Sequence, residues 1–335
     1  MARYATILGT GSYVPEREIT NATFAEWMGE TSPKLAEVVG KFEASSGIKT
    51  RFYAPDDWAT SDLAAEAGRR AIADAGITPE DIDLVLVGTD SPDYITPATS
   101  VVTQHKLGAV NAGTWDIGCA CASFPTGLAQ AAGMIATNPH LKYILVIGAY
   151  MMHKLADTKK DVMSFFYGDA GGAAVIGVSD KPGFVSSSIK ADGSYHKHWG
   201  IYSGGTYEPA TVESVEAGRT TVKLLTPFPP TVNHEGWPAR VRECAANGGF
   251  DVKDIDHIIF TQVNVNSIKL VMEDLGLPVE NAHYVMDKWG YAGSACLPLA
   301  LDDAIKLGKI TSGMRVVLCG SGVGYNQAAV CFIMP

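Results

Sequence analysis

The chain has 335 residues, of which 47% are hydrophobic and 19% charged, enough for a large buried core. Its net charge of −10 argues against nucleic acid and anionic membranes as partners. We find no apolar run long enough to span a bilayer, and we expect no signal peptide, because the first residues already form a strand pattern. Six cysteines without a regular framework indicate a reducing, cytoplasmic compartment and predict neither disulfides nor a metal site.

The first half of the chain alternates helical and strand patterns. Residues 61–76 begin with Ser and Asp, continue with small apolar residues and end at Gly, which predicts a helix. An Asp-Ile-Asp turn then leads into the apolar run 84–89, which is typical of a strand covered on both faces. Such alternation indicates an α/β fold.

Residues 115–128 place two cysteines between a short strand and a helix expected over 122–136. A helix N-terminus offers unpaired N–H groups and a positive dipole end, so we expect the pKa of Cys121 to fall and its sulfur to become a nucleophile. The alternative interpretation is that Cys119 and Cys121 are small buried hydrophobic residues, as most cysteines are.

The second half of the chain repeats the first. Residues 77–89 are echoed by 250–261, 141–148 by 314–320, and 168–176 by 324–332. Because the offset is about half the chain, we predict a duplicated domain, with halves 1–178 and 179–335. Residues 196–238 interrupt the pattern with Gly, Pro, Thr and aromatic residues, and we expect an insertion that covers a pocket.

Several motifs occur in an order that resembles one known family. They are Gly9–Glu16, Ser46–Arg51, Asp116 with Cys121 and Phe124, Phe166–Ala173, Ala191–Tyr195 and Gly320–Tyr325. The chain is similar in these to the ketoacyl-acyl-carrier-protein synthase III family and its acyltransferase relatives. The resemblance implies a thiolase-like α/β fold with five alternating layers, αβαβα, and a homodimer.

The resemblance also implies roles for individual residues. Cys121 would take the acyl group as a thioester from coenzyme A or an acyl carrier protein, with no permanently bound cofactor. Backbone N–H groups of Cys121 and of the turn Gly322-Val323-Gly324 would form the oxyanion hole, where side-chain identity matters little. Lys154 keeps a positive charge at a position that contacts the cofactor, while Phe124 belongs to the motif around the nucleophile.

This sequence departs from the family at the condensation residues. The family's His-Gln-Ala-Asn motif is Thr261-Gln262-Val263-Asn264 here, and its catalytic Asn is replaced by Tyr291. Neither a Thr hydroxyl nor a Tyr phenol is a general base near pH 7. We expect Thr261, Gln262 and Tyr291 to line the acceptor side. Residues that usually contact coenzyme A are replaced by Lys41, Ser45 and Asn266.

Three functions fit this pattern. The first is an acyltransferase that loads Cys121 and passes the acyl group to an acceptor without the usual decarboxylative condensation. The second is a decarboxylating ketosynthase of fatty-acid or polyketide biosynthesis, with His196, His198 or His234 as a substitute base. The third is a non-catalytic partner subunit of a heteromeric synthase, which the retained Cys121 disfavours.

Overall fold

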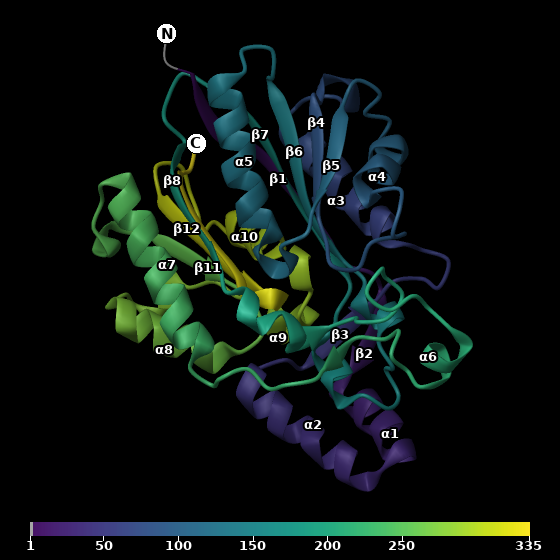
Figure 1. The fold of residues 1–335 in the computed structure, drawn as a ribbon. Coiled ribbons are helices and arrows are strands. Elements are labelled where there is room, and N and C mark those ends of the chain that lie inside the picture. Colours follow the sequence, from purple (N-terminus) through teal and green to yellow (C-terminus); the bar gives the residue numbers. More distant parts are fainter. Residues whose placement is uncertain (1–2) are drawn as a thin grey trace.

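The computed structural model describes residues 3–335, and two β-sheets form the core of this part of the chain (Figure 1). The first sheet has the strand order β1-β7-β6-β4-β5, and the second has the order β11-β12-β13-β8. The strands of the first sheet are β1 (Tyr4–Tyr13), β4 (Leu84–Gly88), β5 (Gly113–Ile117), β6 (Tyr143–Tyr150) and β7 (Ala170–Ser179). Those of the second are β8 (Phe184–Ala191), β11 (His257–Phe260), β12 (Arg315–Gly322) and β13 (Asn326–Ile333).

The two sheets repeat one pairing pattern. β4 runs parallel to β6, which pairs antiparallel with β7, and β7 pairs antiparallel with β1. In the second sheet β11, β12, β13 and β8 are joined in the same way. Leu84 faces Ile144 across the first parallel pair, and His257 faces Val316 across the second. The duplication expected from the sequence is therefore visible in strand order and direction.

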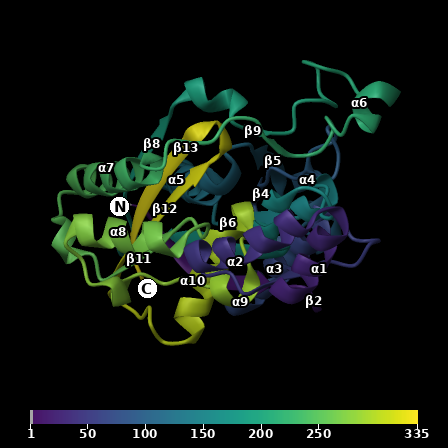
Figure 2. The same ribbon diagram turned by 90° about the horizontal axis from the view of Figure 1, so that it is seen from below.

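Helices fill the space between the sheets and cover their outer faces, which gives the five alternating layers (Figures 1 and 2). The central layer is α5 (Ser123–Thr137) and α10 (Cys296–Lys306); α3 (Thr60–Asp74) and α4 (Thr99–Leu107) cover the first sheet, and α7 (Val232–Gly248), with α8 (Val265–Leu275) beside it, covers the second. The remaining elements are β2 (Arg17–Thr20), β3 (Thr50–Tyr53), β9 (Trp199–Gly200), β10 (Lys223–Leu224), α1 (Asn21–Thr31), α2 (Pro33–Ser46), α6 (Val212–Glu216) and α9 (Met286–Trp289).

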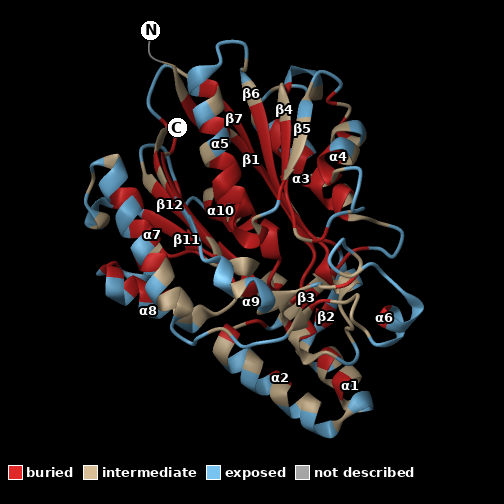
Figure 3. Ribbon diagram, viewed as in Figure 1, coloured by how far each residue is buried: buried red, intermediate tan, exposed pale blue. Residues whose placement is uncertain are grey.

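Helix α5 is buried on most of its surface because it packs between the two sheets (Figure 3). Phe124, Leu128, Ala131 and Ile135 recur at helical spacing and are each fully buried. Gly127 lies so close to β6 that an added Cβ would come within 2.8 Å of Val146. Small residues therefore allow the sheets to approach this helix closely.

The insertion is shorter than the expected range 196–238. Residues from Val232 onward already belong to α7, even though Pro238 lies inside this helix. Trp237 is fully buried and its ring stacks on Phe260 of β11, with ring centroids 5.1 Å apart. This packing offsets the cost of the proline, a tertiary effect that the local sequence does not reveal.

The division into halves at 178/179 stays a prediction, although β7 ends at Ser179 and β8 begins at Phe184. The helix expected over 61–76 is α3, which ends at Asp74, with Gly76 following at a positive φ of 68°. Within residues 3–335, no helix has both the length and the apolar character needed to cross a membrane.

Candidate active site

Cys121 lies in a 3-10 turn, Ala120–Ala122, that joins β5 to α5. Helix α5 therefore begins at Ser123, one residue later than the sequence predicted. The turn packs against the end of β12, where a Cβ on Gly322 would lie 2.3 Å from the Cys119 carbonyl oxygen and 2.9 Å from the Cys121 nitrogen. Only glycine fits at position 322, so this contact fixes the backbone of the nucleophile.

Asp116 holds the strand that precedes this turn. Its two carboxylate oxygens accept hydrogen bonds from the backbone N–H groups of Thr99, at 2.8 Å, and Ser100, at 2.7 Å. Both donors lie in the first turn of α4, where backbone N–H groups have no partner inside the helix. Asp116 therefore positions the end of β5 against α4, and it has no direct contact with the sulfur.

The Cys121 side chain opens into a cavity of about 240 Å³. Its lining residues are Asp90, Cys121, Tyr150, Met152, Tyr167, Trp199, Gly200, Ile201, Val222, Tyr291 and Val323. A second cavity of about 240 Å³ lies on the other side of Trp199, Tyr291 and Val323, which line both. The other residues of the second cavity include Thr261, Val263, Asn264, Ser267, Ser321, Gly322 and, from the insertion, Phe228, Pro229 and Pro230. The insertion thus contributes walls to both cavities.

The pKa of the Cys121 thiol is raised, whereas the sequence analysis expected it to fall. Complete burial raises the pKa of its thiol above the ordinary value, and the nearby Asp90 carboxylate raises it further. Hydrogen bonds from the Tyr291 hydroxyl and from the Cys121 backbone N–H act in the opposite direction but do not outweigh burial. The predicted fall in pKa is therefore wrong, because loss of hydration dominates over the helix terminus.

Thr261 and Tyr291 are the residues that the sequence analysis predicted in place of the condensation pair. The Tyr291 hydroxyl contacts the Cys121 sulfur directly, and its ring forms part of the wall between the cavities. The Thr261 hydroxyl accepts a hydrogen bond from the Ser321 N–H at 3.0 Å and donates to the Ser321 carbonyl oxygen at 3.4 Å. The Thr261 hydroxyl therefore bonds the backbone of β12, while the Tyr291 hydroxyl contacts the Cys121 sulfur.

The sequence reasoning missed Asp90. This residue is the second after the end of β4 and lines the Cys121 cavity, where its carboxylate accepts one long hydrogen bond, 3.4 Å, from Ser294. Burial raises the pKa of Asp90 to about 6. A signal was present, because Asp90 stands at the carboxyl end of a parallel strand, where α/β sheets commonly place their functional groups.

The other residues proposed for the site divide into two groups. Gly322, Val323 and Asn264 line a cavity, whereas Gln262, Phe124, Gly324 and Lys154 line neither. The Gln262 amide is used structurally: it donates to the Phe260 carbonyl oxygen at 2.9 Å and accepts from the Val285 N–H at 2.8 Å. The Lys154 ammonium donates to the carbonyl oxygens of Asp56 and Trp58, at 2.7 and 2.5 Å.

The three histidines considered as a substitute base lie away from the sulfur. His196 is exposed, His198 packs on Phe228, and His234 is 3.1 Å from the Ser267 hydroxyl. None of them lines the Cys121 cavity. Among the described residues that do, Asp90 is the ionisable group whose pKa lies nearest neutrality.

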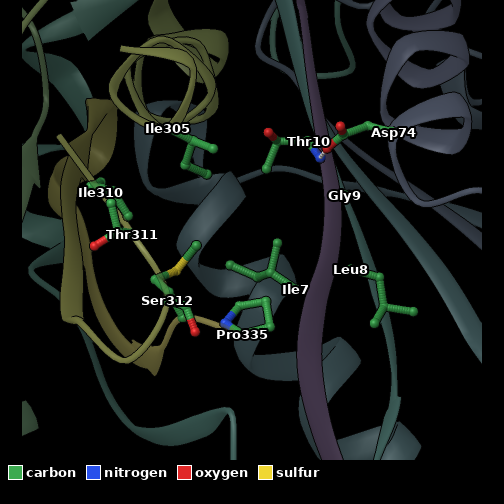
Figure 4. A pocket seen from close by; sticks show the side chains of 11 residues that line it. Ile7, Leu8, Gly9, Thr10, Asp74, Ile305, Ile310, Thr311, Ser312 and Pro335 are labelled. Atoms are coloured by element: carbon green, nitrogen blue, oxygen red, sulfur yellow. Dashed lines mark hydrogen bonds between the residues drawn. The ribbon is translucent and has the colours of Figure 1, made fainter. Parts of the chain in front are cut away.

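Another hollow, of about 130 Å³, lies between β1 and the end of α10 (Figure 4). Its walls are mainly aliphatic, and its only charged side chain is Asp74, whose carboxylate accepts the Thr10 N–H at 2.8 Å. Since no cysteine or histidine lines this hollow and its charged group is already bonded, the cavity at Cys121 is the stronger candidate for an active site.

This architecture and the buried cysteine at the start of the central helix agree with what is known of one family. Residues 115–193 match the family model for 3-oxoacyl-[acyl-carrier-protein (ACP)] synthase III, and residues 245–333 match the model for the C-terminal region of that synthase. The chain belongs to the 3-oxoacyl-[acyl-carrier-protein] synthase III family, whose fold is the thiolase fold.

Solved structures support the same assignment. The synthase III of Aquifex aeolicus VF5 has a TM-score of 0.84 and 25% identity, covering 98% of this chain and 99% of that one. The β-ketoacyl synthase III of Thermus thermophilus has a TM-score of 0.85 and 29% identity, covering 98% and 99%. The priming β-ketosynthase of the R1128 polyketide pathway has a TM-score of 0.85 and 28% identity, covering 100% and 97%.

Proposed function

We propose that this protein is a cysteine acyltransferase that takes an acyl group from a thioester onto Cys121 and passes it to an acceptor without decarboxylative condensation. The observation that carries the proposal is the surroundings of the sulfur. Cys121 opens into a cavity beside the Tyr291 hydroxyl, and no histidine is among the residues that line this cavity. The nucleophile is thus retained without the usual condensation pair.

The two half-reactions balance without an external base. In the first, the Cys121 sulfur bonds to the acyl carbon, the carbon–sulfur bond of the donor breaks, and the thiol proton ends on the departing donor thiol. In the second, the acceptor's nucleophilic atom bonds to the acyl carbon, the bond between that carbon and the Cys121 sulfur breaks, and the acceptor's proton returns to the sulfur. The Tyr291 hydroxyl, in contact with that sulfur, is placed to pass the proton in each step.

Decarboxylation, unlike acyl transfer, requires groups that stabilise an enolate. Loss of carbon dioxide from a malonyl thioester creates an enolate, whose oxygen must be held by positioned donors, and one such donor is typically worth about 10²–10³ in rate. The Thr261 hydroxyl is already bonded to the backbone of Ser321. Tyr291 is bonded to the nucleophile itself. Neither group is therefore free to hold an enolate.

The second cavity is the proposed approach for the donor and the acceptor. Thr261, Asn264 and Ser321 line it, and only Trp199, Tyr291 and Val323 separate it from the Cys121 side. A pantetheine arm of coenzyme A or of an acyl carrier protein has the amide groups that such polar side chains bind. In this proposal Lys154 does not bind the donor directly, because its ammonium already donates hydrogen bonds to two backbone carbonyl groups.

A homodimer is part of the proposal. β5 is an edge strand of the first sheet, and an unpaired edge is a template for association. Tyr94 and Ile95, which lie in the neighbouring segment between β4 and α4, are 57% and 83% exposed. Light scattering at micromolar concentration should give twice the mass of the chain, and a monomer would contradict this part.

The test of the function is to measure carbon dioxide release from malonyl thioesters alongside acyl loading. The wild-type protein should form the acyl adduct and release no carbon dioxide above background. The double variant Thr261→His with Tyr291→Asn should gain release, because it restores the two family residues. Release by the wild type that Thr261→Ala leaves unchanged would instead show a ketosynthase with a substitute base. Absence of any adduct would favour a non-catalytic partner subunit.

A further inference from the structure

The cavity beside Cys121 contains a carboxylate that no cation neutralises. Asp90 forms no salt bridge with any described residue, and the long hydrogen bond from Ser294 is its one side-chain contact with a donor. The segment Asp90–Thr99, which would meet a second copy in the proposed dimer, also contains no Lys or Arg. A partly buried carboxylate without a cation or several donors is costly, so this charge favours a cationic partner brought by the substrate.

The rest of the cavity wall is aromatic. Tyr150 stands at its centre, with ring centroids 6.2 Å from Tyr167 and 5.9 Å from Tyr291, and Trp199 continues the wall at 6.2 Å from Tyr167. All four rings line the same cavity as Asp90. Aromatic rings attract cations through their negatively polarised faces, and a carboxylate surrounded by such rings is a typical site for an ammonium group.

Tyr150 gives a second, independent indication of a ligand. Only 3% of this residue is exposed, and its hydroxyl has no hydrogen-bond partner within residues 3–335. The Tyr167 hydroxyl, in contrast, accepts a hydrogen bond from the Trp199 indole at 3.1 Å. Because Tyr150 lines the cavity and forms no hydrogen bond with a described residue, its hydroxyl is available to a ligand there.

We infer that the acyl group accepted by Cys121 carries a protonated amine, whose ammonium binds the Asp90 carboxylate inside the wall formed by Tyr150, Tyr167, Trp199 and Tyr291. The inference rests on the proposed acyl loading of Cys121. A cavity of about 240 Å³ has room for such a chain, because an apolar cavity of about 150 Å³ already admits benzene. The substrate class is therefore an aminoacyl thioester rather than a plain alkanoyl thioester.

An alkanoyl chain would place methylene groups against the Asp90 carboxylate and remove its water, which is unfavourable. A hydroxyl would satisfy one hydrogen bond but would leave the charge uncompensated. An ammonium both donates hydrogen bonds to the Asp90 carboxylate and neutralises its charge. It also affects the Cys121 thiol. Because the Asp90 charge raises the pKa of Cys121, an ammonium beside Asp90 lowers that pKa and favours the thiolate when the correct donor is bound.

The test compares N-acetylcysteamine thioesters with chains of equal length. The 3-aminopropionyl, butyryl and 3-hydroxypropionyl thioesters have the same number of heavy atoms and differ only in the terminal group. Loading of Cys121 is followed by intact-protein mass spectrometry at pH 7.5. The aminoacyl chain should load at least about tenfold faster than the butyryl chain. Asp90→Asn should remove this preference, and Asp57→Asn, which changes an exposed carboxylate elsewhere, should keep it.

Butyryl loading that equals or exceeds aminoacyl loading would overturn the inference but leave the proposed acyl transfer intact. So would fastest loading of the hydroxyacyl chain, or a preference that survives Asp90→Asn. If no thioester loads, the proposed acyl transfer fails, and a binding measurement then decides the ammonium site. Cys121→Ala should bind the non-reacting amide analogue of the 3-aminopropionyl thioester, by calorimetry, at least about tenfold more tightly than the butyryl amide. Equal binding would overturn the inference in that case.

Discussion

The two central helices begin in the same way, yet only one of them presents a cysteine to a cavity. Helix α5 follows the 3-10 turn Ala120–Ala122, helix α10 follows the 3-10 turn Gly293–Ala295, and each has proline as its third residue. Cys121 is the middle residue of the first turn and opens into a cavity. Ser294 is the middle residue of the second, and its hydroxyl donates to the Ala120 carbonyl oxygen at 3.1 Å.

The difference between the turns lies in what packs against them. A Cβ on Gly148 of β6 would lie 2.0 Å from the Ser294 carbonyl oxygen, and the equivalent atom on Gly320 of β12 would lie 2.8 Å from that of Cys121. Both turns are therefore pressed against a strand by glycine. Only the turn that contains Cys121 also lines a cavity whose other walls include residues of the insertion, such as Trp199 and Val222. A duplicated scaffold thus supplies two rigid helix starts, and the insertion leaves a cavity at one.

Replacing the middle residue of each turn tests this difference and should give the largest effect. Cys121→Ala should abolish acyl loading, a loss on the order of 10³-fold or more, because loss of the nucleophile removes the covalent step. Ser294→Ala should stay within a few-fold of the wild-type rate, since Ser294 does not line the cavity and its hydrogen bond to Asp90 is long, 3.4 Å. Loading is measured by intact-protein mass spectrometry. Equal losses in the two variants would show that both turns take part in the reaction.

Gly322→Ala should destabilise the protein by about 1–3 kcal/mol, because the added methyl group meets backbone atoms of Cys119 and Cys121 that cannot move aside. Gly133→Ala is the matched control: it lies in α5 with no atom within 4 Å of an added Cβ, and it should stabilise by about 0.5–1 kcal/mol. Denaturant unfolding measures both changes. A neutral Gly322→Ala would show that the turn is not held by this contact.

His257 distinguishes the two sheets, because its counterpart in the first sheet is Leu84. Burial, His283 and Lys309 lower the pKa of His257 to about 4. The unfolded chain takes up its proton near pH 6.5, so stability falls as the pH drops from about 6.5 toward 4. His257→Leu should recover about 2 kcal/mol at pH 5 relative to pH 8. Identical pH profiles for both proteins would contradict this assignment.

The smallest effects concern the titration of the thiol. Asp90→Asn removes a charge that raises the pKa of Cys121, so its alkylation by iodoacetamide should become several-fold faster at pH 7.5. Tyr291→Phe removes a hydrogen bond that lowers this pKa, so alkylation should become slower and its pH profile should move to higher pH. Shifts in the same direction would show that the two groups act through the shape of the cavity rather than through charge.

The sequence predicted the fold well because the repeat is local and strongly patterned. The apolar runs 84–89 and 257–260 and the motif around Cys121 identify the paired sheets and the central helix without tertiary information. The environment of the sulfur could not be predicted in this way. The raised pKa of Cys121 depends on burial by segments far away in the chain, including Trp199 and Tyr291.

Two further differences between the sequence prediction and the structure also arise from contacts between distant parts of the chain. Gln262 follows Thr261 in sequence and was expected in the pocket, but its amide is used by the backbone of Phe260 and Val285. Asp90 was not predicted as a site residue, because a single Asp after a strand is common. Its importance comes from the absence of a cationic side chain among the described residues that line the cavity. Which side chains share a cavity is a property of the folded chain.

The central claim is that Cys121 is the acyl acceptor of the first half-reaction. The direct measurement is to incubate the protein with an acyl thioester, digest it and locate the added acyl mass by peptide mapping. The account predicts the acyl group on Cys121, in the peptide that also contains Cys119. Fragmentation separates these two cysteines, and Cys296 and Cys319 should remain unmodified. Acylation of Cys119 or Cys296 in place of Cys121, or recovery of Cys121 without an acyl group, would contradict the account.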